Sequence, residues 1–465
     1  MSVSKFLNTR FLLSLICVFF LITRLYKISE IPPSVYWDEA SIGYNAYSIS
    51  QTDKDEWGDF LPIHFRAFGE FKLPVYIYST ALSVSIFGLN EFSVRIPSVL
   101  FSLGVVILTY LLAKKLTGQV WVGLWSAFFA TISPWFFIFS RTGFEVTAGL
   151  MFYLLAIYLF LINPRNGSLI LLSLVSFIFS AYSYNSFRII APLTIFILFF
   201  LEKENLINLA KRQLRWVILS LAIVAISIWP IYRLYLYDVG FFRLQAVGTV
   251  NIETFIKNYI SHFSTDFLLN GDKNLRHQQM GFGQLYLPEL VLFLLGVSYL
   301  TFVNSKSKYR FLPIALLLIS PIPAALTKES PHALRALSMV PFISMISAIG
   351  LSLLRPKLKY LFDFGIVLVM LSFYINYFMN FINTYPAQSK EHWQYAYKNF
   401  FMQYNNKFGN YDQVLVSDQY AQPYIFALFY LKYDPEKFRK EVIRNTPDKW
   451  GFSTVKSFGR FYFGD

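Results

Sequence analysis

Long apolar runs recur along most of the chain, and they constrain its fold more than any other feature. A helix that crosses the hydrocarbon of a bilayer needs about 20 mostly apolar residues. Hydrophobic residues make up 55% of the 465 residues and charged residues only 15%, whereas soluble domains are roughly a quarter charged. We therefore predict an α-helical polytopic membrane protein with about 11 transmembrane helices. The expected spans are 9–26, 92–113, 119–138, 146–162, 167–183, 188–201, 214–234, 286–303, 311–326, 336–354 and 360–380.

The first apolar run follows a basic end in "MSVSKFLNTRFLLSLICVFFLITRLY", which is also the pattern of a signal peptide. No small-x-small cleavage site follows it, and the segment continues into Arg24, Tyr26 and Lys27. We therefore expect an uncleaved anchor. Its Cys17 is the only cysteine of the chain, so an intramolecular disulfide is excluded and a packing role is expected.

The orientation depends on a twelfth apolar stretch, "LPVYIYSTALSVSIFGL" at 73–89, which could be a further span or a helix lying at the interface. If it does not cross and the N-terminus is cytoplasmic, the inside segments are strongly basic and the outside loop 27–91 is acidic. Because cytoplasmic loops carry the excess of Lys and Arg, we predict this orientation. The predicted inside cations are Lys5, Arg10, Lys114, Lys115, Arg165, Lys203, Lys211, Arg212, Arg215, Lys306, Lys308, Arg310, Arg355, Lys357 and Lys359.

Two domains are expected. Residues 1–383 form the membrane domain, with interfacial helices in the first outer loop 27–91 and a long outer loop at 235–285. Residues 384–465 read as a small external α/β domain, with a helix near 389–406, a strand "DQVLVS", a helix "PYIFALFYLKY" and a final strand "FGRFYFG".

Ionisable side chains gather at one level of this topology, the outer rim. The centres of the predicted spans carry almost no charge, whereas a secondary transporter would typically place ionisable groups near the midplane. A lipid or solute transporter is therefore the alternative to an enzyme, and a noncatalytic scaffold that binds partners through its tail is a third reading. The rim residues are Asp38, Glu39, Lys72, Arg141, Glu145, Arg188, His262, Asp272, Arg276, His277, Lys328, Glu329, His332 and Arg335.

Chemistry at this rim suits an amphipathic substrate. A polyprenyl-phosphate sugar needs a greasy groove, cations for its phosphate, and a carboxylate that takes the proton of the attacking acceptor hydroxyl. No Walker loop is present, and "GFG" at 281–283 lacks the context of a phosphate cradle, so a nucleotide sugar is disfavoured. The formal charge of +14 resides largely in predicted cytoplasmic loops, which indicates a bilayer partner and no nucleic acid.

Several motifs resemble the glycosyltransferase C superfamily, specifically the branch that holds protein O-mannosyltransferases and the aminoarabinose transferases of lipid A. An outside Asp-Glu pair follows the first span in "YWDEAS". In "FGEFKLPVYIYSTALSVSIFGLNEFSVRIPSVL", Lys-x-Pro precedes an interfacial helix and Gly-x-x-Glu-x-x-x-Arg-x-Pro opens the second span. The stretches "SPWFFIFSRTGFEV", "SYNSFRIIAPL", "GDKNLRHQQMGFGQLYLPEL" and "PHALRALSMVPF" resemble motifs of bacterial members.

This resemblance implies an inverting transferase that moves a sugar from a polyprenyl-phosphate donor to an external acceptor. It implies Asp38 as the catalytic base with Glu39 beside it, and Glu145 where relatives usually have an Asp. Lys72 matches a lysine implied to hold the lipid phosphate. The remaining candidates for the phosphate site are Arg188, Arg276, His277, His332 and Arg335. A bacterial plasma (inner) membrane is the implied location.

Plainer readings stand beside these roles. Asp38 and Glu39 could simply favour a helix N-terminus, and Glu145 could cap the fourth span. Lys72 could be a snorkelling lysine, and His262 is expected to be structural. The sequence identifies neither the sugar nor the acceptor. Carboxylates and histidines at one rim leave a divalent cation open, but no spacing resembles a dedicated site, so no metal ligand is assigned.

Overall fold

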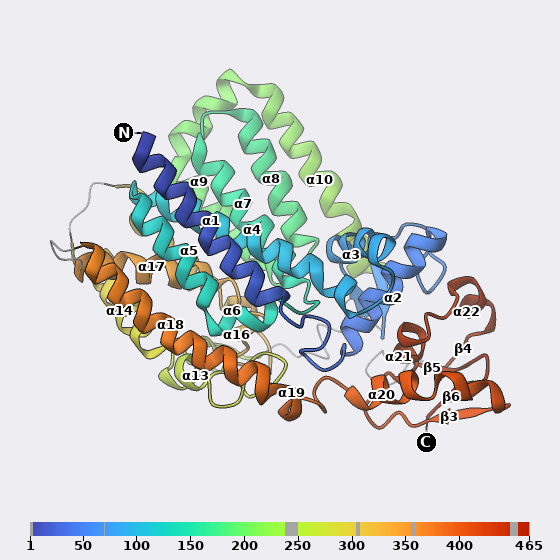
Figure 1. Ribbon diagram of the computed structural model, residues 1–465. Helices are drawn as coiled ribbons and strands as arrows, with labels where there is room; N and C mark the ends of the chain where they lie inside the picture. Colours follow the sequence, from blue (N-terminus) through green and yellow to red (C-terminus); the bar gives the residue numbers. More distant parts are fainter. Residues whose placement is uncertain are drawn as a thin grey trace.

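The computed structural model describes residues 3–68, 70–237, 250–303, 307–354, 359–446 and 454–464. It shows a bundle of apolar helices that continues at one end into a smaller mixed region (Figure 1). Part of the long loop 235–285 and the predicted inside cations Lys306, Arg355 and Lys357 lie outside the described residues. The bundle contains α1 (Val3–Leu25), α4 (Glu91–Thr117), α5 (Val120–Ile132), α6 (Pro134–Phe139), α7 (Val146–Ile162), α8 (Gly167–Ala181), α9 (Phe187–Arg212), α10 (Leu214–Tyr237), α12 (Ile252–Ser261), α13 (Thr265–Asn270), α14 (Leu287–Phe302), α15 (Leu312–Ile319), α16 (Ile322–Ala325), α17 (Met339–Leu354) and α18 (Lys359–Asn383).

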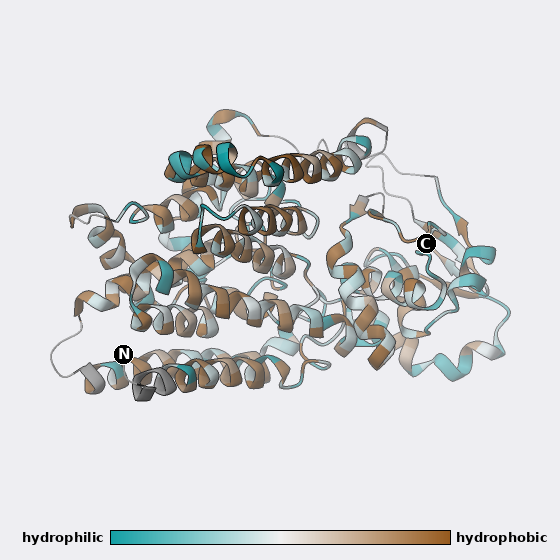
Figure 2. Cartoon of the chain, turned by 90° about the horizontal axis from the view of Figure 1, so that it is seen from above, coloured by the Kyte–Doolittle hydropathy of each residue, from teal (hydrophilic) through white to brown (hydrophobic). Residues whose placement is uncertain are grey.

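The predicted helical membrane protein is confirmed in its coarse form. Among the described residues, three helices are long and apolar enough to cross a membrane: Glu91–Thr117, Leu214–Arg233 and Leu361–Asn383. The number of spans stays a prediction, since most of the other bundle helices are apolar but shorter. The helices of the bundle are mainly brown in Figure 2, and the C-terminal end carries more teal. The shorter apolar helices are Pro74–Phe87, Val120–Ile132, Val146–Ile162, Gly167–Ala181, Leu287–Phe302, Leu312–Ala325 and Met339–Leu354.

Prolines explain why two predicted spans are divided. The expected span 119–138 is split into α5 and α6 at Ser133, whose hydroxyl accepts from the backbone N–H of Phe136 and so caps a new helix that starts at Pro134. Proline has no N–H to continue the preceding helix but suits a first helical position. The expected span 311–326 is similarly divided between α15 and α16, around Pro321.

Close backbone approach holds α14 against α17. A Cβ built on Gly296 would lie 2.0 Å from the carbonyl oxygen of Ile346, and one on Gly350 would lie 2.0 Å from that of Leu292. Only glycine fits at both positions, which is the small-residue packing found between membrane helices. On the other side of the bundle, α4 packs on both α5 and α7, and most of its apolar window is buried.

The first outer loop forms α2 (Trp37–Thr52), the hairpin of β1 (Phe65–Ala67) and β2 (Glu70–Lys72), and α3 (Pro74–Phe87). Helix α3, the stretch that could have crossed, packs on α2 and α4 at the end of the bundle. Asn90 then starts α4, because its side chain accepts from the backbone N–H of Ser93 and the hydroxyl of Ser93 accepts from the backbone N–H of Asn90.

The C-terminal segment contains the elements that its sequence predicts, together with others. A mixed four-stranded sheet has the order β3-β6-β5-β4, with β3 parallel to β6 and the other pairs antiparallel. Gly459, with φ +51°, forms the turn between β5 and β6. The elements are α19 (Tyr385–Gln388), α20 (Tyr395–Gln403), the 3-10 helix η1 (Asn405–Asn410), β3 (Val414–Val416), α21 (Pro423–Tyr430), α22 (Pro435–Glu441), β4 (Ile443–Arg444), β5 (Val455–Phe458) and β6 (Phe461–Phe463).

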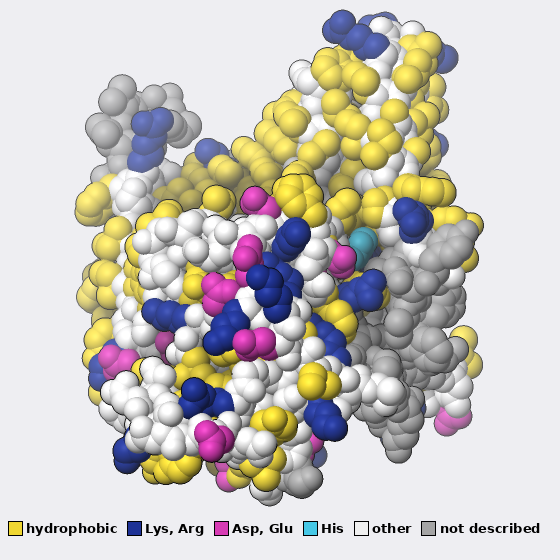
Figure 3. Space-filling model, turned by 90° about the vertical axis from the view of Figure 1, so that its right-hand side faces the viewer, with side chains coloured by type: hydrophobic (Ala, Val, Ile, Leu, Met, Phe, Trp, Pro, Cys, Tyr) yellow, Lys and Arg dark blue, Asp and Glu magenta, His cyan; other side chains and the backbone are white. Residues whose placement is uncertain are grey.

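The C-terminal segment and the first outer loop share one hydrophobic core, which we call the outer core; the bundle core is the larger one formed by the bundle helices. Helix α21 lies on α2, and a Cβ on Gly43 of α2 would stand 2.6 Å from the ring of Phe429. Helix α18 ends at Asn383, and the outer core combines residues of the first outer loop with residues of the C-terminal segment. Charged side chains of both signs are interspersed on this end of the molecule (Figure 3).

Candidate active site

Asp38 and Lys72 meet at the start of α2. Tyr36 is extended and Trp37 begins the helix, which places Asp38 in its first turn, where a carboxylate is favoured. The ammonium of Lys72, at the end of β2, donates to Oδ1 of Asp38, and the indole N–H of Trp37 donates to Oδ2 over 3.2 Å. The Lys72 side chain is 5% exposed and that of Asp38 22%. The carboxylate thus remains reachable from outside while its cation is covered.

Glu145 completes an acid group around the same cation. It is the residue immediately before α7. Burial raises the pKa of its carboxyl, the nearby Lys72 opposes this, and the nearby Asp38 raises it further. Burial alone would lower the pKa of Lys72, but Asp38 and Glu145 together raise it above its usual value. Two carboxyls therefore share one ammonium, and we call Asp38, Lys72 and Glu145 the acid group.

Glu39, adjacent in sequence, has a different environment. Its side chain is fully buried, and Oε1 and Oε2 accept from Nε and Nη2 of Arg95 over 3.1 and 3.2 Å. Oε1 also accepts from the backbone N–H of Gly143 over 2.6 Å. Arg95 in turn donates to the carbonyls of Ile28, Pro32 and Ser34. Both oxygens of Glu39 are thus engaged in joining α2, α4 and the loop after α6.

Arg276 and Arg188 lie on different sides of this group. The Arg276 guanidinium stands over the rings of Tyr36 (4.9 Å) and Trp37 (5.9 Å), the two residues that precede Asp38 in the chain. Arg188, in the first turn of α9, donates to the carbonyl of Ala181 over 3.4 Å. It also lies near His64 of the first outer loop, where burial and the Arg188 charge lower the pKa of the imidazole to about 4. Arg276 is therefore, besides Lys72, a predicted cation that the fold brings to the start of α2.

His277 and His332 meet Asp272 in a second group, which we call the histidine cluster. Nδ1 of His277 lies 2.6 Å from Oδ2 of Asp272, which also accepts from the backbone N–H of Ala333 over 2.9 Å. The His277 and His332 ring centroids are 4.8 Å apart. His262 is buried beside them and accepts from the backbone N–H of His332 over 3.2 Å.

Arg335 follows the histidine cluster and belongs to its rim. Its guanidinium donates to the hydroxyl of Thr327 over 2.8 Å and lies 3.6 Å from Oε2 of Glu329. The Arg335 side chain is only 20% exposed, whereas Glu329 is largely exposed. Arg335 therefore presents a cation close to the cluster, with an acid partner that solvent can reach.

Tyr184 lies in the short loop before α9. Burial raises the pKa of its phenol, the charge of Arg335 lowers it, and the charges of Glu145 and Asp38 raise it. Tyr184 is therefore within electrostatic reach of both the acid group and Arg335.

Comparison with known proteins identifies the fold. The family model described as dolichyl-phosphate-mannose-protein mannosyltransferase matches residues 72–232. ArnT from Cupriavidus metallidurans is similar in structure, with a TM-score of 0.63, 10% sequence identity, and coverage of 93% of this chain and 85% of that one. The chain has the glycosyltransferase C fold. The predicted resemblance to the branch of O-mannosyltransferases and ArnT is thereby confirmed.

Other glycosyltransferase C structures are similar over the same length. ArnT bound to undecaprenyl phosphate gives a TM-score of 0.61 at 10% identity, again with 93% and 85% coverage. The apo oligosaccharyltransferase of Archaeoglobus fulgidus gives 0.54 at 15% identity, with 93% of this chain and 64% of that chain covered. Our chain thus spans less than two thirds of the archaeal protein. No curated protein sequence matches it.

Sequence reasoning missed three residues that organise the site on this glycosyltransferase C fold. Arg95 belongs to the Arg-x-Pro motif and Tyr184 to "SYNSFR", but the sequence analysis assigned neither residue a role. Gln394 is the third: its Oε1 accepts from the backbone N–H of Trp37 over 3.0 Å, so the C-terminal segment holds the start of α2. The Arg-x-Pro motif, in which Arg95 precedes Pro97 of α4 by two residues, was a usable signal for Arg95, whereas nothing in the local pattern singled out Gln394.

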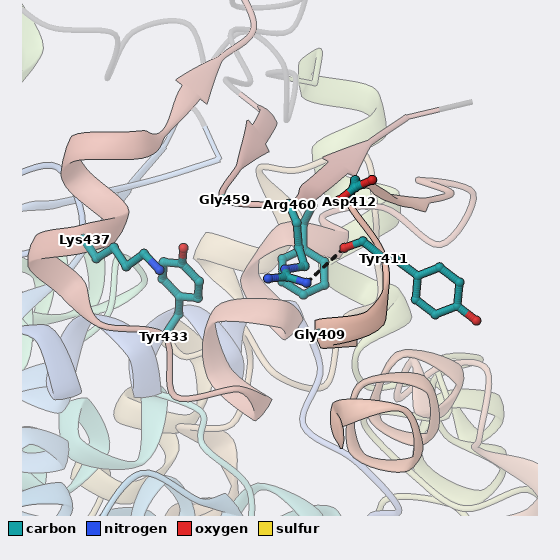
Figure 4. Close-up of a pocket in the computed structure, with 8 residues that line it drawn as sticks. Gly409, Tyr411, Asp412, Tyr433, Lys437, Gly459 and Arg460 are labelled. Carbon is teal, nitrogen blue, oxygen red and sulfur yellow. Dashed lines mark hydrogen bonds between the residues drawn. The ribbon is translucent and has the colours of Figure 1, made fainter. Parts of the chain in front are cut away.

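A surface hollow of about 380 Å³ lies in the C-terminal segment, and none of its lining residues belongs to the predicted site. Figure 4 shows the Lys437 side chain beside the ring of Tyr433, and Arg460 donating to the carbonyl of Tyr411 over 2.9 Å. Tyr433 donates to Glu441 over 2.6 Å. The Arg460 contact joins the start of β6 to the end of η1, and the Tyr433 contact lies along α22. Packing around the sheet is therefore sufficient to explain why these residues line the hollow.

Proposed function

We propose that the protein is an inverting glycosyltransferase that moves a sugar from a polyprenyl-phosphate donor to an acceptor on the outer face of the membrane. The observation that carries this proposal is the acid group: a partly exposed carboxylate, Asp38, beside a covered ammonium, Lys72. ArnT has been solved with undecaprenyl phosphate and the archaeal oligosaccharyltransferase with a dolichol-phosphate and an inhibitory peptide. We carry over only their shared chemistry, a polyprenyl phosphate.

In the proposed reaction, the acceptor oxygen attacks the anomeric carbon while its proton passes to Asp38. The bond between that carbon and the phosphate oxygen breaks, and polyprenyl phosphate leaves with the bonding electrons. Lys72 and Arg276 stabilise the phosphate charge, as preorganised cations do for developing anions. When a phosphate attracts Lys72, the ammonium leaves Oδ1 of Asp38, and that oxygen can then accept the proton.

The other predicted residues receive supporting roles. Glu145 shares the charge of Lys72 and helps to hold it in place. Glu39 is assigned a positioning role, because both its oxygens are engaged with Arg95 and Gly143. His277, His332 and Arg335 border the donor phosphate, and Arg188 lies farther along the rim. The proposed location is the plasma (inner) membrane, with a cytoplasmic N-terminus and both the site and the C-terminal segment outside.

The test compares Asp38→Asn with Asp53→Asn in a strain from which the gene is deleted. Asp53 is an exposed acid that ends α2 in a left-handed conformation that asparagine tolerates, so it is a matched control. Mass spectrometry measures polyprenyl-linked sugars that accumulate when transfer stops. Losing a general base costs about 100- to 10,000-fold in rate, so Asp38→Asn should accumulate the carrier as the deletion does. Normal carrier levels with Asp38→Asn would exclude Asp38 as the base.

A further inference from the structure

The histidine cluster has the composition of a metal site. Asp272, His277 and His332 are buried, and one ligand atom of each lies within 4.8 Å of the others. Asp272 and His277 come from the loop that follows α13, and His332 from the loop that follows α16. We propose that these three residues bind one divalent transition-metal ion. Two imidazoles and one carboxylate are the ligand set that zinc accepts, with a fourth position left for water or an anion.

The hydrogen bonds of the cluster indicate which atoms would bind the metal. Nδ1 of His277 and Oδ2 of Asp272 are 2.6 Å apart, so one proton lies between them. Zinc would take the place of that proton, which is released to solvent, as is usual when a metal binds protein ligands. Nδ1 of His332 accepts from the backbone N–H of Arg335 over a long 3.3 Å, and this weak hydrogen bond would have to give way for the lone pair of Nδ1 to reach the ion.

The surroundings of His332 resemble those of other ligating histidines. Its Nε2 lies 3.9 Å from Oε2 of Glu329. A metal-bound imidazole usually donates its second N–H to a carboxylate or a carbonyl, which fixes the ring and strengthens the ligand. Glu329 is exposed and free to approach. His262 plays no part as a ligand, because its Nδ1 lies 2.8 Å from the carbonyl of Asn258 and its Nε2 accepts from the backbone of His332.

The acid group offers no comparable site. There the ammonium of Lys72 already donates to the Asp38 carboxylate, where a metal ion would have to bind. Around the histidine cluster the neighbouring cations are guanidinium groups, those of Arg276 and Arg335, which stand outside the three ligands. Two flanking cations favour an anion in the fourth position.

A metal at this place would clamp two outer loops together. It would join the loop of Asp272 and His277 to the loop of His332, and it would hold Arg276, the neighbour of His277, over Tyr36 and Trp37. The inference concerns metal binding alone and holds whether or not the chain transfers a sugar.

The experiment uses the full chain, purified in detergent with an affinity tag that contains no histidine and stripped with a chelator. Zinc is titrated in, and bound metal is measured by elemental mass spectrometry after gel filtration. Cobalt(II) serves as the spectroscopic probe, since a site of low coordination number gives visible absorption bands. We expect one equivalent of zinc, release of protons on binding, and cobalt bands that zinc abolishes. Absence of stoichiometric zinc in the wild type would overturn the proposal.

Variants locate the site. His277→Gln, His332→Gln and Asp272→Asn should each weaken zinc binding at least tenfold, whereas His392→Gln, which changes an exposed histidine of the C-terminal segment, should leave it unchanged. Equal binding by a folded His277→Gln/His332→Gln double variant would place the metal elsewhere and contradict the proposal. If the variants fail to fold, the cobalt spectrum of the wild type decides, since a six-coordinate aqueous spectrum would also contradict it.

Discussion

The two hydrophobic cores are assembled from contacts of different range. Much of the bundle core joins helices that are neighbours in the chain, such as α4 with α5 and α7 with α8. The outer core joins the first outer loop to the C-terminal segment, and its hydrogen bond from Tyr424 to Glu56 spans 368 residues. The acid group lies where the two cores meet. The bundle alone therefore does not complete the site, because α2 needs the C-terminal segment to hold its first turn.

The largest effect should follow from breaking the buried pair that connects the cores. Arg95→Met leaves the Glu39 carboxylate buried without its cation, and it also removes the donor for three carbonyls. Removing one member of a buried ion pair typically costs about 3–5 kcal/mol. We expect a loss of this size in the free energy of unfolding, measured by denaturant titration in micelles.

A double variant separates the charge from the geometry. Glu39→Gln/Arg95→Met removes both charges, so it should recover part of the stability that Arg95→Met loses. If Arg95→Met alone loses less than about 1 kcal/mol, the pair does not connect the cores in the way described.

One pH effect should come from the outer core. Burial raises the pKa of Glu56 from 4.5 to about 7, with Arg444 lowering it and Asp55 raising it further. The folded chain therefore holds this proton more tightly than the unfolded chain. The contribution of Glu56 to the free energy of unfolding is fully present below about pH 4.5. It is lost as the pH rises to about 7, and the loss is on the order of 3 kcal/mol.

Glu56→Gln provides the check on this assignment. The variant should lose the part of the pH dependence that Glu56 contributes across the same window, while its bundle core is unchanged. The measurement is the free energy of unfolding from pH 4.5 to 8. A slope that is identical in the wild type and in Glu56→Gln would show that another group titrates.

The smallest effect tests packing between α2 and α21. In Gly43→Ala the new methyl group meets the Phe429 ring at 2.6 Å and the Val94 side chain at 2.7 Å. Overpacking of this kind costs about 1–3 kcal/mol. Gly365→Ala in α18 is the matched control, because nothing lies within 4 Å of its Cβ, so a gain of about 0.5–1 kcal/mol is expected. Equal thermal midpoints for the two variants would mean that α2 and α21 are not closely packed.

The sequence predicted the bundle better than the outer core because the two depend on different information. Apolar length and loop charge indicate helices and their orientation without reference to distant residues. Lys72, Asp38 and Glu39 were predicted as site residues from their place in this topology and from the order of the motifs. Asp38 is partly exposed, whereas Glu39 is buried and paired with Arg95. Only the three-dimensional structure shows this difference, since both acids lie in one helical turn.

Other parts of the site were inaccessible from sequence because their partners are remote. Gln394 contacts Trp37 across 357 residues, and His332 contacts His262 across 70. The three ligand-type residues of the histidine cluster show no regular spacing, since they belong to two loops that only tertiary packing brings together. Prolines at 134 and 321 were visible, but their effect in dividing helices was overlooked.

The shared outer core also has a consequence for biosynthesis. A chain inserted from its N-terminus exposes the first outer loop early, yet the residues that finish its core, between 397 and 463, emerge from the ribosome only after the bundle helices. Domains that can close early generally do so during translation. Here α2 must wait for the C-terminal segment, so translation products truncated before that segment would leave an apolar surface uncovered.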